Sequence, residues 1–202
     1  MPKKIFVLFF GYAIIMFFSL MGGVSYLNAK LIEGNFSSIQ YDEYSELSGL
    51  PGAKIQKKVY IKGDKMRAEN KVTGVIEFII GDKFYQYNPV TNEATFFYIS
   101  QGKEFTSNLQ RIMKIPNKEK IGEEMIEGRL CDVYKYADEK GILKKVWIAK
   151  DIDLQVKIEM GIMREQLKNI IVNPYLDDSL FELPAGAQIK DASTIVDKLL
   201  SK

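Results

Sequence analysis

The sequence predicts an α+β fold, in which one antiparallel sheet combines with helices and is preceded by an N-terminal apolar helix. Three patterns predict this class. Residues 59–99 contain short runs rich in Val, Ile, Phe and Tyr that are separated by turn residues. Residues 100–114 place apolar side chains at the spacing of one helix face. Residues 5–21 form a continuous apolar run near the amino terminus.

Residues 1–29 have the organisation of a secretory signal peptide. Lys3 and Lys4 precede the apolar run 5–21, and small residues follow it. Because this run is about as long as the shortest membrane-spanning helix, an uncleaved membrane anchor is the alternative. Either reading predicts an exported protein, periplasmic or extracytoplasmic, with residues 30–202 as one domain.

The first half of this domain predicts a meander of antiparallel strands. A mixed strand and loop region is followed by a long strand that ends before Gly63-Asp64. Gly81-Asp82 lies between two apolar runs at the spacing of a two-residue hairpin, and Asn88-Pro89 opens a longer turn. The expected strands are 54–61, 74–80, 83–87 and 95–99.

Two of these strands, 83–87 and 95–99, carry aromatic or aliphatic side chains on both faces. A sheet with one wetted face should instead place a polar residue at every second position. Both faces therefore need cover. Two arrangements satisfy this: a helix layer on one face with a curved half-barrel interior on the other, or a sheet packed between layers without a cavity.

The stretch 100–114 predicts the best internal helix, and it ends before Pro116. The apolar residues of its face are Phe105, Leu109, Ile112 and Met113. Two roles fit this pattern, a core-packing helix and a mobile lid. A second amphipathic stretch predicts a C-terminal helix over 191–202, with Asp191 or Ser193 as its cap.

The second half of the domain continues in the same hairpin style. Trp147 is the only tryptophan and is expected to pack against the sheet edge, and Cys131 is expected to be a small buried hydrophobe. Asp177 and Asp178 are expected to cap a turn rather than to bind calcium. The expected strands are 122–125, 128–137, 141–149, 154–159 and 165–172.

Four short blocks occur in a recognisable order along the chain. They are KGDKMR at 62–67, EEMIEG at 123–128, VWIAKD at 146–151 and SLFELPAG at 179–186. With the hairpin FIIGDKFYQYNP, they resemble the LolA/LolB/RseB-like periplasmic lipoprotein-carrier superfamily, above all its uncharacterised secreted relatives, over residues 36–189. The resemblance implies a strongly curved antiparallel sheet, an incomplete β-barrel, that is closed by helices over an apolar cavity for acyl chains.

Composition argues against several other functions. The chain contains no histidine, and it has no serine-nucleophile elbow, phosphate loop or metal-ligand spacing. It carries 28 Lys and Arg against 26 Asp and Glu, and two of the lysines lie in the leader, so the domain is neutral. We therefore expect no enzyme, no catalytic residue, no metal, no cofactor and no nucleic-acid partner. The carboxylates around Glu123 are expected to form a solvated surface.

The predicted ligand site is an apolar cavity with a lid. Arg67 matches the arginine with which carriers of this superfamily hydrogen-bond the lid when the cavity is empty, and the alternative is a surface ion pair with Glu69. Ala68 and Glu69 replace the apolar residues that follow this arginine in true carriers. The candidate cavity and lid residues are Arg67, Phe78, Ile80, Tyr85, Tyr87, Phe97, Ile99, Phe105, Leu109, Ile112 and Met113.

The sequence thus predicts an exported, non-catalytic protein that holds a lipid or a lipidated protein in an apolar half-barrel. The expected partners are an acyl chain, a lipid or a lipoprotein, and the domain is expected to be a monomer. The alternative is an envelope-stress sensor or regulatory module of the RseB type that binds a membrane protein.

Overall fold

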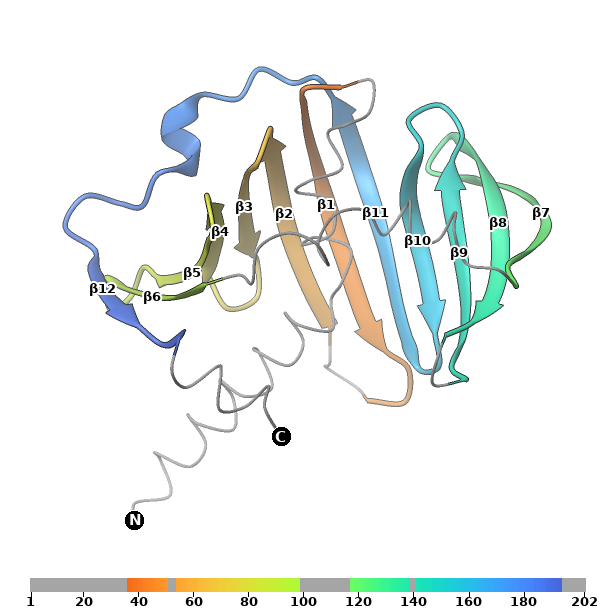
Figure 1. Ribbon diagram of the computed structural model, residues 1–202, viewed down its shortest axis with the longest axis horizontal. Helices are drawn as coiled ribbons and strands as arrows, with labels where there is room; N and C mark the ends of the chain where they lie inside the picture. Colours follow the sequence, from red (N-terminus) through yellow and green to blue (C-terminus); the bar gives the residue numbers. More distant parts are fainter. Residues whose placement is uncertain (1–35, 51–53, 99–116, 139–140, 194–202) are drawn as a thin grey trace, which may run out of the picture.

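The computed structural model describes residues 36–50, 54–98, 117–138 and 141–193, and these form one large β-sheet (Figure 1). The sheet has the order β12-β6-β5-β4-β3-β2-β1-β11-β10-β9-β8-β7. Its strands are β1 (Ser38–Leu47), β2 (Lys54–Lys62), β3 (Lys65–Asn70), β4 (Ile76–Ile80), β5 (Lys83–Asn88), β6 (Glu93–Tyr98), β7 (Glu119–Ile126), β8 (Arg129–Ala137), β9 (Leu143–Ala149), β10 (Leu154–Met160), β11 (Met163–Val172) and β12 (Gln188–Asp191).

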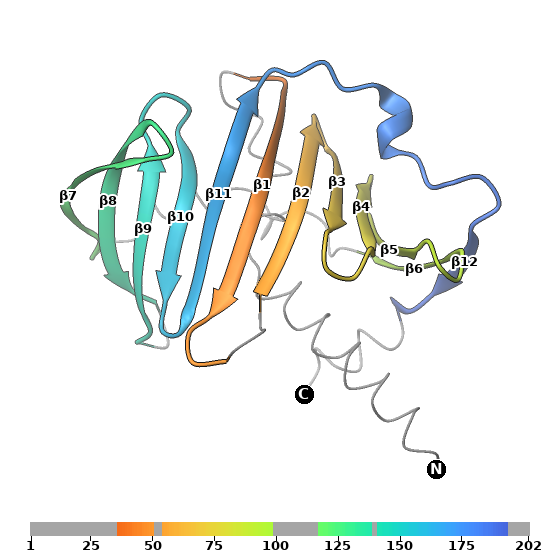
Figure 2. The same cartoon turned by 180° about the vertical axis from the view of Figure 1, so that it is seen from behind.

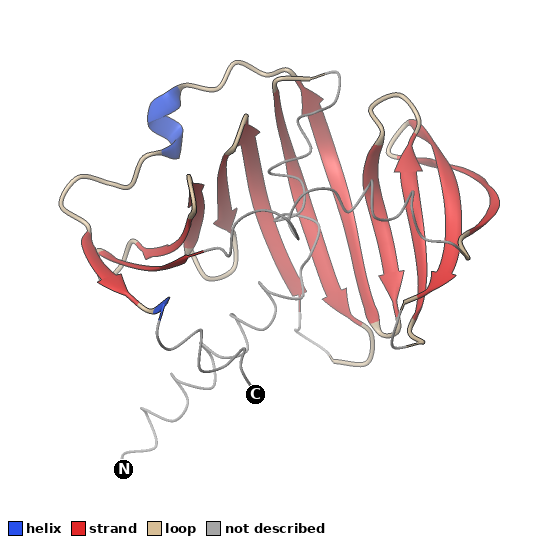
Figure 3. Ribbon diagram, viewed as in Figure 1, coloured by secondary structure: helices blue, strands red, loops and turns tan. Residues whose placement is uncertain are grey.

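The α+β class expected from the sequence is wrong for this part of the chain. The only helical element that lies wholly within the described ranges is the 3-10 turn η1 (Asp178–Phe181) (Figure 3). The sheet is also not closed, because β7 and β12 stand at its two ends and have one partner strand each. The helix expected over 100–114, nearly all of the one expected over 191–202, and the leader lie outside the described residues.

The predicted meander is confirmed for β2, β4, β5 and β6, and β3 is an additional strand of it that was not among the expected ones. Each of these strands pairs antiparallel with the next, from Lys57 opposite Asn70 to Tyr85 opposite Phe96. Gly81 sits in the two-residue turn between β4 and β5 with a φ of 62°, a left-handed conformation that glycine adopts without steric cost. Local turn chemistry therefore sets the register of this half.

A second meander, β7 to β11, joins the first at the centre of the sheet. β1 pairs antiparallel with both β2 and β11, although β1 and β11 are more than 100 residues apart in the sequence. In Figure 1, β5, β6 and β12 run across the direction of β1 and β11. The sheet therefore twists strongly from its centre to this end.

One face of the first meander carries a row of aligned apolar side chains, which we call the apolar row. Its members are neighbours across successive strands and belong to the main hydrophobic core, where they are buried except for the half-buried Phe97. The apolar row consists of Ile39, Ile61, Met66, Ile79, Phe84 and Phe97.

The opposite face is covered by the chain after β11. Phe78, Tyr87 and Ala94 form a second core there, against which Leu183 and Ala187 pack. Figures 1 and 2 show this segment running from the end of β11 past β3 and β4 to β12, which pairs in parallel with β6 at the sheet edge. The prediction that both faces need cover is therefore confirmed for this face.

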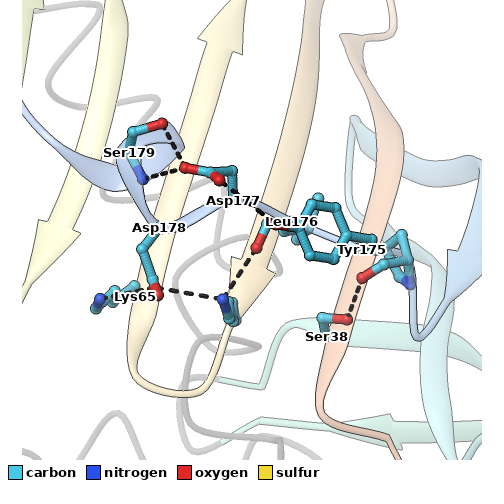
Figure 4. A network of polar contacts seen from close by, with 9 residues as sticks. Ser38, Lys65, Tyr175, Leu176, Asp177, Asp178 and Ser179 are labelled. Carbon is cyan, nitrogen blue, oxygen red and sulfur yellow. Dashed lines mark hydrogen bonds and ion pairs between the residues drawn. The ribbon is translucent and has the colours of Figure 1, made fainter.

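Polar contacts hold this segment against β1, β2 and β3 (Figure 4). The Ser38 hydroxyl donates to the Pro174 carbonyl at 2.7 Å, and Lys62 Nζ donates to the Leu176 carbonyl at 2.9 Å. Asp177 caps η1, because its Oδ1 accepts from the backbone N–H of Ser179 at 2.9 Å. The predicted turn-capping role is confirmed for Asp177.

Candidate functional site

The structure separates the predicted cavity residues onto two faces of the sheet. Arg67, Phe78 and Tyr85 align across β3, β4 and β5 on the face that the C-terminal segment covers. Ile80 and Tyr87 pack on the same face. Phe97 is part of the apolar row on the opposite face. The remaining predicted residues, Ile99, Phe105, Leu109, Ile112 and Met113, lie outside the described residues.

Arg67 makes the ion pair that was the alternative to the lid contact, and it also contacts the C-terminal segment; the lid, expected over 100–114, lies outside the described residues. Its Nε donates to Glu69 at 3.0 Å, which is the expected ion pair. Its Nη1 also donates to the Leu180 carbonyl at 3.2 Å, and the guanidinium carbon lies 5.3 Å from the centre of the Phe78 ring. Arg67 therefore fastens η1 to the sheet.

Sequence reasoning missed four ionisable side chains that lie buried on the face of the apolar row. Glu43, Lys57, Glu77 and Glu165 come from β1, β2, β4 and β11, and each is at most 3% exposed. We call them the buried charge cluster. Lys57 lies directly opposite Glu43, and its Nζ donates to Glu77 Oε2 at 2.8 Å. Four strands thus converge on one charged site.

The strands place this cluster by simple alternation. Glu43 follows Ile39 and Tyr41 at every second position of β1, so its side chain points to the same face as theirs. Lys57 precedes Val59 and Ile61 on β2 in the same way. The signal available in the sequence was an acidic residue at the same alternate positions as the buried residues. In IQYDEYS this signal is hard to recognise, because Asp42 and Glu43 place an acid on each face of the strand.

Burial raises the pKa of two carboxyls of the cluster, Glu43 on β1 and Glu165 on β11, which are diagonal neighbours because Glu165 lies opposite Ser45. Desolvation raises the pKa of Glu43 to about 7; the Lys57 ammonium opposes this rise, and the Glu77 carboxylate adds to it. Desolvation likewise raises the pKa of Glu165 well above its ordinary value, and the charge of Glu43 adds to this effect. Both groups therefore hold protons more firmly than exposed glutamates do.

The hydrogen bonding of these two carboxyls is incomplete. Ser45 Oγ donates to Glu165 Oε2 at 3.4 Å. Glu43 Oε2 and Glu165 Oε1 are buried and have no hydrogen-bond partner among the described residues. Because a buried polar atom without a partner is costly, a hydrogen-bond donor that reached either oxygen would stabilise the site.

Other acidic residues are engaged at the surface. Glu123 accepts from Lys120 and Lys150, and hydrogen bonds from both lysines lower its pKa. Glu124 accepts from the Trp147 indole at 2.8 Å, so the tryptophan reaches toward the edge strand β7. These carboxylates form the solvated surface that was predicted.

Cys131 is fully buried, as the sequence predicted, and desolvation raises the pKa of its thiol. Within the described ranges, no group of three acidic or cysteine side chains could hold a metal ion. The same part of the chain also contains no helix that is long and apolar enough to cross a bilayer.

The similarity of this chain to known proteins is visible in structure and not in sequence. No protein-family model matches it, and no curated protein matches it. An uncharacterized conserved protein from Thermus thermophilus superposes with a TM-score of 0.55 at 12% identity, over 86% of this chain and 99% of that one. MucB from Pseudomonas aeruginosa, in its complex with MucA, gives a TM-score of 0.55 at 10% identity over 84% of this chain.

This chain spans 63% of the MucB chain, so the similarity covers part of that protein. The lipoprotein LppX from Mycobacterium tuberculosis gives a TM-score of 0.49 at 16% identity, over 77% of this chain and 97% of that one. The resemblance drawn from the four sequence blocks is confirmed at the level of the fold: the sheet has the LolA/LolB/RseB-like architecture.

Proposed function

Because this chain has the LolA/LolB/RseB-like fold, we propose that it is an exported, non-catalytic binding protein that holds the acyl chain of a lipid or lipidated protein. The observation that carries the proposal is the apolar row, which crosses six strands on one face. At about 4.8 Å between strands the row is about 24 Å long. This exceeds the ~15 Å that one leaflet of a bilayer's hydrocarbon core measures.

Burial of an acyl chain on this face provides enough free energy for binding. Each buried CH2 contributes about 0.8 kcal/mol, so a chain of about 16 carbons gains about 12 kcal/mol before ordering costs. Most of the apolar row is buried in the structure, and a guest must displace whatever covers it. That displacement lowers the net affinity and makes the binding reversible, which suits a carrier.

Uptake of a fluorescent fatty acid by the purified, delipidated protein tests the proposal. Phe97 and Tyr98 are a matched pair, since they are adjacent on β6 but point to opposite faces. We expect Phe97→Asp to weaken the binding by at least tenfold, because it places a charge on the apolar row. Tyr98→Asp, at a side chain that is 51% exposed, should leave the affinity unchanged. Absence of uptake, or equal effects of both changes, contradicts the proposal.

A regulatory module of the RseB type is the second candidate, and the similarity to MucB favours it, since that protein was solved in complex with MucA. In this case the partner is a membrane protein and not a lipid. Affinity capture from solubilised membranes distinguishes the two candidates. Recovery of one membrane protein, equally by wild type and by Phe97→Asp, favours the regulator, and loss of the capture with Phe97→Asp favours the carrier.

A further inference from the structure

We propose that the buried charge cluster is a subsite for a positively charged head group, an ammonium carried by an amphiphile whose chain lies on the apolar row. This inference rests on the proposed function and names the class of ligand. It follows from the charges of the cluster, from the two unpartnered oxygens, and from the position of both beside the row.

The cluster has fewer cations than carboxyls. Lys57 is the only buried cation among the described residues, and its Nζ is engaged by Glu77 at 2.8 Å. Among the described residues three carboxyls thus share one ammonium, which leaves an excess of two negative charges when Glu43 and Glu165 are both ionised. Two protons can neutralise them, or one ammonium can replace a proton while the other carboxyl stays neutral.

The unpartnered atoms have the right chemistry for an ammonium. Glu43 Oε2 and Glu165 Oε1 come from different strands of the same face, and both are buried. An ammonium group offers three N–H donors, and ionised carboxylates accept such bonds more strongly than neutral partners do. A fatty-acid carboxylate would instead add a further negative charge to the same site.

The apolar row and the charge cluster are adjacent on the sheet. Glu77 is two residues from Ile79 on β4, which corresponds to about 7 Å along the strand. On β2, Val59 separates Lys57 from Ile61 of the row. Glu43 is four residues from Ile39 of the row on β1, about 13 Å along the strand, so the head group reaches it when the part of the chain next to the head group runs along the strands from the row.

Protons and the ammonium compete for the same carboxyls, so binding must depend on pH. Among the described residues, the titratable groups that face the site are Tyr41 and Glu43 from β1, Lys57 from β2, Glu77 from β4 and Glu165 from β11, and β3 contributes the neutral Asn70. Burial raises the pKa of Glu43 to about 7. Cationic amphiphiles should therefore bind more tightly at pH 8 than at pH 5.5.

Displacement of a fluorescent acyl probe by dodecylamine, dodecanol and dodecanoic acid tests the inference, because these compounds share one chain length. At pH 8 we expect dodecylamine to bind about tenfold more tightly than dodecanol, a difference of about 1.4 kcal/mol. At pH 5.5 this preference should decrease. Glu43→Gln and Glu165→Gln should abolish it, whereas Glu46→Gln, on the other face of β1, should retain it.

The outcomes separate this inference from the proposed function. Equal binding of amine and alcohol, or preference for the acid, overturns the ammonium subsite and leaves acyl binding intact. Failure of all three compounds to displace the probe, or failure of the probe to bind, overturns both. If a Gln variant does not fold, the pH dependence of the amine preference in the wild-type protein still decides.

Discussion

Replacing Glu43 by Gln should change the pH dependence of stability in a direction that burial of this carboxyl determines. In the folded protein its pKa is about 7, against 4.5 as its ordinary value. Between these two pH values the folded state holds a proton that the unfolded state has lost. The contribution of Glu43 to stability is therefore complete below pH 4.5 and is lost as the pH rises through 7.

The size of the effect follows from the shift. One pKa unit corresponds to about 1.36 kcal/mol, so this group changes the free energy of unfolding by about 3 kcal/mol across the window. Gln has nearly the same shape and does not titrate. Relative to wild type, Glu43→Gln should therefore gain about 3 kcal/mol between pH 4.5 and pH 8, or about 6 to 12 °C in Tm for a domain of this size.

Urea denaturation of wild type and variant at several pH values measures this difference. The raised pKa of Glu165 acts in the same direction, so the double variant Glu43→Gln/Glu165→Gln should show the flattest profile. Glu46→Gln serves as the control on the opposite face of β1. A difference between Glu43→Gln and wild type that stays constant with pH, or that changes in the opposite sense, would refute the buried position of this carboxyl.

Three further predictions concern the packing of the sheet. Arg67→Met should destabilise the protein by about 1 to 3 kcal/mol and speed proteolysis at the C-terminal segment, because the Leu180 carbonyl loses its charged donor; unchanged proteolysis would contradict this. Phe84→Ala should cost about 3 to 5 kcal/mol in urea denaturation, since the ring is 4% exposed, and a loss below about 1 kcal/mol would mean that the site is loosely packed. Trp147→Phe should cost about 1 to 3 kcal/mol, because Glu124 loses the indole donor while most of the ring volume remains; a stability equal to wild type would contradict that role.

The strands of the first half could be predicted because their turns are local. Gly81-Asp82 and Asn88-Pro89 indicate where the chain reverses direction, and the antiparallel pairing of β4 with β5 and of β5 with β6 follows from these turns. The pairing of β1 with β11 could not be predicted in this way, because no turn connects them and the register depends on contacts more than 100 residues apart. The α+β class was predicted from the helical patterns of residues 100–114 and 191–202, and nearly all of these lie outside the described residues, which are almost entirely β.

Of the apolar row, only Phe97 was among the residues predicted from the sequence, and the buried charge cluster was missed entirely. Phe97 was identified because aromatic residues fill both faces of β6, but alternation alone does not state which face is shared with β1 and β2. Phe78 and Tyr85 therefore stood in the same predicted cavity although they belong to the other face. Glu43 and Glu165 were overlooked because acidic residues are usually assigned to solvent.

The burial of these carboxyls bears on which role the face has. A sheet face that served only as a packing surface would be more stable with apolar side chains of similar volume in place of Glu43, Lys57 and Glu165, because desolvating charges usually costs more than their pairing returns. The cluster therefore lowers stability at neutral pH, as the raised pKa of Glu43 shows. A ligand that brings its own positive charge offsets this cost only while it is bound. The same carboxyls therefore destabilise the protein without ligand and stabilise its complex with a cationic ligand. Acidification protonates Glu43, which removes this attraction and favours release.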